Sequence, residues 1–120
     1  MNFNVSVPCF PTEDREKVEN CLYNLFGEVE ISEKEEKEKK FLLCEPKDAS
    51  KLLKILEKEK IRKSFLEVLQ SNYSNGKTKI NLSKPAAFMG KARISEEFSL
   101  GHIELVIFCE LDELERWIYG

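Results

Sequence analysis

Polar and apolar residues alternate over residues 2–7, and this period of two predicts a half-buried strand that ends at Pro8. A helical pattern follows, because the next apolar residues are spaced three and four apart: Val18, Cys21, Leu22, Leu25 and Phe26. Thr12 is the expected N-cap, two acidic residues favour the first turn, and Gly27 is the expected stop. The chain therefore opens with a strand followed by a helix.

Short apolar runs at residues 29–31 and 41–44 predict a second and a third strand. Between them, residues 32–40 are Glu and Lys apart from Ser32, and we interpret this run as the exposed tip of a hairpin. Asp48 is expected to cap a helix through about Lys60, and helical spacing continues to Gln70 after a bend. The central part of the chain thus predicts a hairpin followed by helices.

Alternation returns at residues 77–80 and 91–94, which predict two more strands, and at residues 102–109, which predict a last one. Both faces of this last strand are largely apolar at its far end, so we expect it to be central in the sheet. Residues 111–117 predict a terminal helix. Together the elements predict an α+β fold with a mixed or antiparallel sheet and helices packed mainly on one face.

Length and composition favour one intracellular domain spanning residues 1–120. No apolar run is long enough to span a membrane, and the N-terminus lacks the basic region of a secretory signal, so we expect a cytoplasmic protein. The four cysteines are widely spaced without a neighbouring His, which indicates small buried side chains rather than a metal site. No cofactor motif occurs, and the lone His102 has no discernible catalytic partners, so we expect no enzymatic activity.

Charge is segregated along the chain. Eight of the nineteen Lys and Arg residues fall within residues 60–93, where Glu67 is the one acid, so this window carries +7. The whole chain carries −3, and the other 86 residues therefore carry −10. Such segregation is typical of a protein in which one face meets a polyanion, and RNA is our first candidate.

The basic residues of the two strands at 77–80 and 91–94 define the predicted RNA surface. Alternation places Lys77 with Lys79, and Lys91 with Arg93, on one face of each strand. If the strands are neighbours, these four cations form one patch, with Lys84 on the connection and Phe88 near enough to stack. Further cations at Lys60, Arg62 and Lys63 could extend it. The structural alternative is an ordinary solvent face, since lysines often protect an edge strand.

Gly90 is also a candidate contact, because a glycine with positive φ beside Lys91 could present free N–H groups to a phosphate. A structural turn between the Ala-rich segment and the following strand requires the same residue, and the two explanations stay open. The start of the first helix is a weaker anion site, since Glu13 and Asp14 would repel one.

Three motifs resemble the archaeal uncharacterised protein family 0201. They are Pro11, Thr12, Glu13 and Asp14 with Lys17 and Val18; Asn81 through Ala87 with Gly90 and Lys91; and Leu100 and Gly101 with Ile103. The resemblance covers nearly the whole chain and implies an α+β fold similar to the large-subunit ribosomal protein L-five, an RNA-binding role and no enzymatic activity. Lys84, Gly90 and Lys91 match the family pattern, whereas Arg15, Ser83 and Pro85 depart from it.

Two hypotheses follow from the sequence. In the first, the protein binds RNA phosphates and shape through Lys77, Lys79, Lys84, Lys91 and Arg93. In the second, the same polarised surface engages an acidic partner or a second copy of the chain, as in a homodimer.

Overall fold

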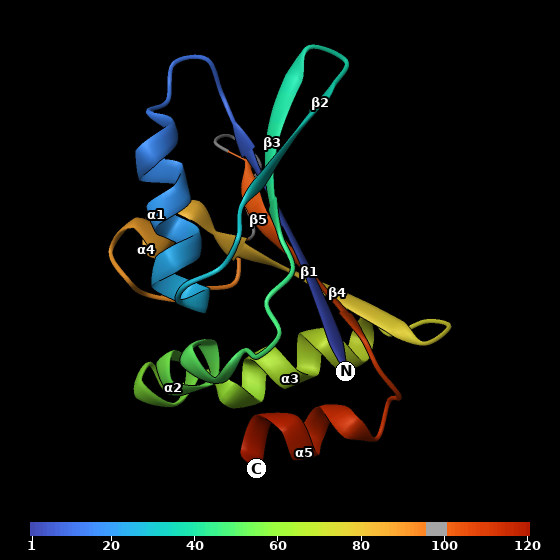
Figure 1. Ribbon diagram of the computed structural model, residues 1–120. Helices are drawn as coiled ribbons and strands as arrows, with labels where there is room; N and C mark the ends of the chain where they lie inside the picture. Colours follow the sequence, from blue (N-terminus) through green and yellow to red (C-terminus); the bar gives the residue numbers. More distant parts are fainter. Residues whose placement is uncertain (96–100) are drawn as a thin grey trace.

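A five-stranded antiparallel sheet forms the centre of the computed structural model, which describes residues 1–95 and 101–120 (Figure 1). The strands are ordered β2-β3-β1-β5-β4, so β2 and β4 are the edges and β5 is internal, as predicted. In chain order the elements are β1 (Asn2–Cys9), α1 (Arg15–Phe26), β2 (Ser32–Glu36), β3 (Lys39–Cys44), α2 (Ser50–Lys58), α3 (Arg62–Ser71), β4 (Lys77–Ser83), α4 (Lys84–Phe88), β5 (His102–Phe108) and α5 (Glu113–Tyr119). The predicted α+β class is confirmed.

The helices gather on one side of the sheet, and the core lies between the two layers (Figure 1). Strand alternation follows from this arrangement. In β4, Thr78, Ile80 and Leu82 are buried against the helices, and the residues between them point the other way. The same alternation occurs in β1 and β5. We call the side that the helices leave uncovered the open face.

Each helix turns an apolar stripe toward the sheet. Five residues of α1 are buried, the same five whose spacing predicts the helix. Helices α2 and α3 meet at Lys60, whose left-handed backbone (φ 59°) makes the predicted bend. Helix α5 closes the layer, because Trp117 packs on Phe3 with ring centroids 5.5 Å apart. Local periodicity therefore predicts the helical layer well.

Strand pairing changes the expected hairpin. The charged run belongs mostly to the strands, since β2 covers Ser32–Glu36 and only Lys37 and Glu38, both with positive φ, form the turn. Val29 and Ile31 lie before β2 and pack partly buried against the core. No residue of β2 is buried, so this strand is held by its ladder of backbone hydrogen bonds to β3 and not by core side chains of its own. Backbone pairing here overrides the polarity of the side chains.

The predicted strand at residues 91–94 is wrong. A single bridge joins Ile94 to Leu82, and the chain after β4 forms α4. Ser83 caps this helix by accepting a hydrogen bond from the Ala86 N–H (3.2 Å), and Pro85 is favourable in its first turn. The predicted N-cap of the first helix also differs, because Asp14 replaces Thr12 by accepting a hydrogen bond from the Glu16 N–H (3.0 Å). Thr12 and Asp14 are both residue types favoured at an N-cap, so this difference is a choice between nearby capping residues.

All four cysteines are buried, which confirms their interpretation as core side chains. Burial raises the pKa of the Cys21 and Cys44 thiols to about 12, so both are protonated at neutral pH. Over residues 1–95 and 101–120, no group of three His, Cys, Asp or Glu side chains is placed to hold a metal ion. No helix in these ranges is both long and apolar enough to cross a membrane.

Gly101 directly precedes β5, at a position where there is no room for a side chain. Its φ is +74°, and a Cβ there would lie 2.5 Å from Cγ of Pro8. Leu100, which precedes Gly101 in the third family motif, lies outside the described residues. The close approach fixes the entry to β5 against the end of β1.

Replacing Gly101 by Ala should therefore destabilise the protein by about 2–4 kcal/mol, because left-handed strain and a clash act together. Gly90→Ala is the matched control, since Gly90 has φ +73° but open space around its Cβ position. That control should lose only about 1–2 kcal/mol. Urea denaturation measures both, and equal losses would show that the contact with Pro8 contributes nothing.

Candidate nucleic-acid interface

The outer strand β4 brings Lys77 and Lys79 to the open face. Both side chains are exposed and alternate with the buried Thr78 and Ile80. Lys77 lies opposite Phe108 of β5, and Phe108 in turn lies opposite Asn2 of β1. A cation, an aromatic ring and an amide thus occupy one row across three strands.

A second row lies directly beside the first. Lys79 is paired with Val106 of β5, and Val106 is paired with Asn4 of β1. Phe108 is 38% exposed, which is high for a phenylalanine on a sheet, and both asparagines are exposed. We call this group the open-face patch, and it comprises Asn2, Asn4, Lys77, Lys79 and Phe108. It offers two cations, two amides and one accessible ring on a rigid surface.

Arg93 shares the open face but lies at the other end of β4. Its carbonyl accepts a hydrogen bond from the Ser83 N–H (2.8 Å), and the bridge at Leu82 places the two residues opposite each other. Ser83 lies four positions after Lys79 along the strand, which is about 13 Å. Between them, Asn81 is paired with Glu104, an acid on the same face. The basic residues therefore form two groups rather than one patch.

Gly90 and Lys91 end helix α4 instead of presenting free N–H groups. The Gly90 N–H donates to the Ala87 carbonyl (3.0 Å), and the Lys91 N–H donates to the Ala86 carbonyl (2.9 Å). With φ +73° at Gly90, these bonds form a Schellman motif that closes the helix. The proposed phosphate nest at Gly90 is therefore wrong, because its donors are occupied. The exposed side chain of Lys91 remains a candidate contact.

Lys84 is inside the protein, which contradicts its predicted place on the basic surface. Its side chain is 1% exposed, and its Nζ donates to Glu13 Oε1 (2.6 Å) and to the carbonyl of Pro8 (2.5 Å). The same Nζ lies 5.1 Å from the centre of the Phe10 ring. Lys84 thus joins the end of β1, the loop before α1 and helix α4.

The cations near the start of α3 also miss the predicted patch. Lys60, Arg62 and Lys63 belong to the helical layer, so the sheet lies between them and the open face (Figure 1). Arg62 stacks on the Tyr119 ring of α5 at 5.1 Å. Phe88 is exposed, but it ends α4, which packs against α1. None of these four residues extends the open-face patch.

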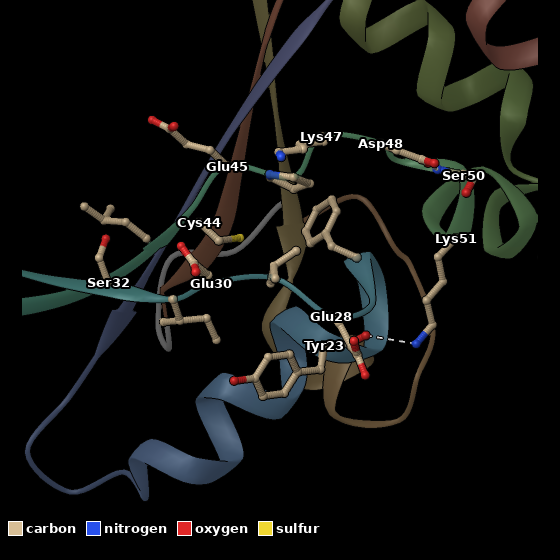
Figure 2. Close-up of a pocket in the computed structure, with 15 residues that line it drawn as sticks. Tyr23, Glu28, Glu30, Ser32, Cys44, Glu45, Lys47, Asp48, Ser50 and Lys51 are labelled. Atoms are coloured by element: carbon tan, nitrogen blue, oxygen red, sulfur yellow. Dashed lines mark hydrogen bonds between the residues drawn. The ribbon is translucent and has the colours of Figure 1, made fainter.

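A groove of about 1270 Å³ opens near the edge strand β2, where the chain after α1 separates from the end of β3 (Figure 2). Figure 2 shows Glu28, Glu30, Glu45 and Asp48 among its lining residues, and the Lys51 Nζ donates to the Tyr23 carbonyl (2.9 Å). Four carboxylates against two lysines would repel a nucleic acid. The groove is therefore not the polyanion site.

Comparison with known proteins identifies the family of this chain. A family model described as RNA binding matches residues 2–108, which include every strand. The chain belongs to this RNA-binding family. The match covers all five residues of the open-face patch.

Several archaeal proteins are similar to this chain. A UPF0201 protein of Methanothermobacter thermautotrophicus is 26% identical over 110 residues, which is 92% of this chain and 82% of the relative. Another, from Thermococcus kodakarensis, is 28% identical over 113 residues, or 91% and 82% of the two chains. The crystal structure of a UPF0201 protein from Methanococcus jannaschii shares the fold, with a TM-score of 0.88, 22% identity and coverage of 98% and 99%. The resemblance to family 0201 is confirmed, and the likeness to protein L-five stays a prediction.

Asn2, Asn4 and Phe108 are candidate contacts that sequence reasoning missed. Their alternation with buried neighbours places each on the solvent side of its strand. Local sequence does not tell which strands pair, however, and the patch exists only because β5 lies between β1 and β4. The sequence therefore indicates the face on which each of these residues lies, but not that the three strands are neighbours.

The buried Lys84–Glu13 pair predicts an asymmetric response to mutation. Glu13→Gln leaves the Lys84 ammonium buried without its counter-charge and should cost about 3–5 kcal/mol of unfolding free energy. Lys84→Met should cost less, because the side chain of Glu13 is 22% exposed and water can solvate it.

The double variant Glu13→Gln/Lys84→Met should be no less stable than Glu13→Gln alone, since no buried charge remains. Urea denaturation of the three variants and the parent chain gives the coupling energy. Additive losses would contradict a direct interaction between the two side chains.

Proposed function

We propose that this protein binds RNA, without catalysis, through the open-face patch. The observation that supports this most is the row of Lys77, Phe108 and Asn2 on the open face, in a chain whose family is described as RNA binding. Lysines neutralise phosphates, and an exposed ring on a sheet is a platform on which an unpaired base can stack. The lysine, the ring and the amide could therefore contact the phosphate and the base of one nucleotide.

The patch also suggests how contacts are divided. Lys77 and Lys79 lie on the edge strand, where an RNA backbone can pass along the sheet without meeting a helix. Phe108 lies one strand inward, and the amides of Asn2 and Asn4 lie one strand further. Phosphates at the edge and bases toward the centre would satisfy all five side chains. Arg93 and Lys91 would add phosphate contacts farther along the backbone.

Charge reversal tests the proposal directly. Lys77→Glu/Lys79→Glu should weaken binding to a structured RNA with an unpaired loop at least tenfold at low salt. It should also flatten the plot of log affinity against log salt by about 1.4, since each single-strand phosphate contact contributes about 0.7. Lys91→Glu/Arg93→Glu should have a smaller effect, because these residues lie apart from the patch.

Lys17→Glu/Lys37→Glu is the control, because it changes the net charge equally at exposed positions of α1 and the hairpin turn. Phe108→Ala should weaken binding while leaving the salt slope unchanged, since stacking releases no counterions. If the parent chain fails to bind RNA at low salt, the proposal is wrong. A concentration-dependent mass that the β4 variant abolishes would instead support the competing interaction or dimerisation role.

A further inference from the structure

A second group of lysines lies on the helical layer, and only part of it belongs to the basic window of residues 60–93. Lys51, Lys54 and Lys58 are spaced three and four residues apart on α2, so they lie along one side of that helix. All three are exposed, and the buried residues Leu52 and Leu56 lie on the other side. The spacing thus gathers lysines on the face of α2 that points away from the core.

These lysines differ from those of the β2–β3 hairpin in forming no salt bridge. Hydrogen bonds from Ser50 are the main cause of the lowered pKa of the Asp48 carboxyl, and Lys54 is near enough to help lower it. In the hairpin, Lys34 pairs with Glu36 (3.2 Å) and Lys40 pairs with Glu33 (3.7 Å). Among the ion pairs of residues 1–95 and 101–120, none involves Lys54 or Lys58. Neither ammonium group is therefore fixed in a salt bridge of the kind that the hairpin lysines form.

The neighbouring segment carries two further exposed lysines. Lys63 of α3 is exposed and takes part in none of the salt bridges of the described part of the chain. Lys60, at the bend between α2 and α3, is exposed as well. From Lys51 to Lys58 the helix rises about 10 Å, a length comparable to the axial rise of three phosphates in one duplex strand. We call Lys54, Lys58, Lys60 and Lys63 the helical lysine surface.

We propose that the helical lysine surface is a second phosphate-binding site for the same RNA. This inference rests on the proposed function of the open-face patch. The two surfaces lie on opposite sides of the sheet, with the helical layer and sheet between them (Figure 1). The molecule measures 39 × 30 × 27 Å, so a ligand must extend around an edge to reach both. The RNA that binds both surfaces is therefore extended and structured, and a short oligonucleotide cannot reach both.

RNAs of two different lengths test the two sites separately. An oligonucleotide of about 8 nucleotides is near the smaller site sizes of sheet-based binders and should use the open-face patch alone. An RNA of about 40 nucleotides with a stem and a loop is long enough to reach both surfaces. Lys54→Glu/Lys58→Glu should weaken binding of the long RNA about tenfold at low salt and leave the short one within about twofold.

The experiment compares this variant with Lys77→Glu/Lys79→Glu and with the control Lys17→Glu/Lys37→Glu, each against both RNAs over a salt series. Lys51 is left unchanged because its Nζ bonds to the Tyr23 carbonyl. A Lys54→Gln/Lys58→Gln variant removes charge without placing an acid near the end of α2, and it should show about half the slope change. Circular dichroism confirms that each variant is folded.

The outcomes are distinct. A loss of affinity for the long RNA alone supports the second site. If the α2 variant binds both RNAs as the control does, while the β4 variant is weakened, the helical site is wrong and the open-face patch stands. If the parent chain binds neither RNA, both proposals fail together. A parent chain that binds an acidic protein through α2 but no RNA there also overturns the inference.

Discussion

One-sided burial of the sheet is the constraint on which the rest of the structure depends. Helices cover one side alone, so each strand must place its apolar residues there and expose its other side. In β1 this requirement gives Phe3, Val5 and Val7 to the core and leaves asparagines outside. The open face is thus fixed by packing before any function is considered. The side chains on the open face are not needed for the core, so they can be used for binding.

The Lys84–Glu13 pair fixes the position of the chain that follows β4. Because the lysine is held by Glu13 and by the Pro8 carbonyl, α4 is fastened to the end of β1 across the loop before α1. Asn24 adds a hydrogen bond to the Ala87 carbonyl (2.9 Å), and the Schellman motif then turns the chain back to the edge of β4. A residue that matches the family pattern therefore serves the fold, and a match to a motif did not by itself indicate an RNA contact.

Elements that depend on interactions between residues close in sequence are predicted well, and those that depend on residues distant in sequence are not. The sequence predicts helices α1, α2 and α3 because their apolar spacing is local, and it predicts β5 to be central because both faces are largely apolar at the far end of the strand. The sequence predicts the wrong position for β2, because its ladder depends on a partner strand and not on its own side chains. The predicted place of Lys84 on the surface is wrong for the same reason. Nothing near it in sequence shows that Glu13, 71 residues away, neutralises its charge.

The distribution of charge shows why a basic window need not be a basic patch. The +7 over residues 60–93 is divided among α3, the β4 edge, the buried Lys84 and the end of α4, which face different directions. Conversely, Lys54 and Lys58 lie outside that window, yet they project from one helix side. A small ligand would meet only one such group. A ligand with the length and stiffness of folded RNA can meet several, so dispersed cations favour recognition of shape over recognition of a single short sequence.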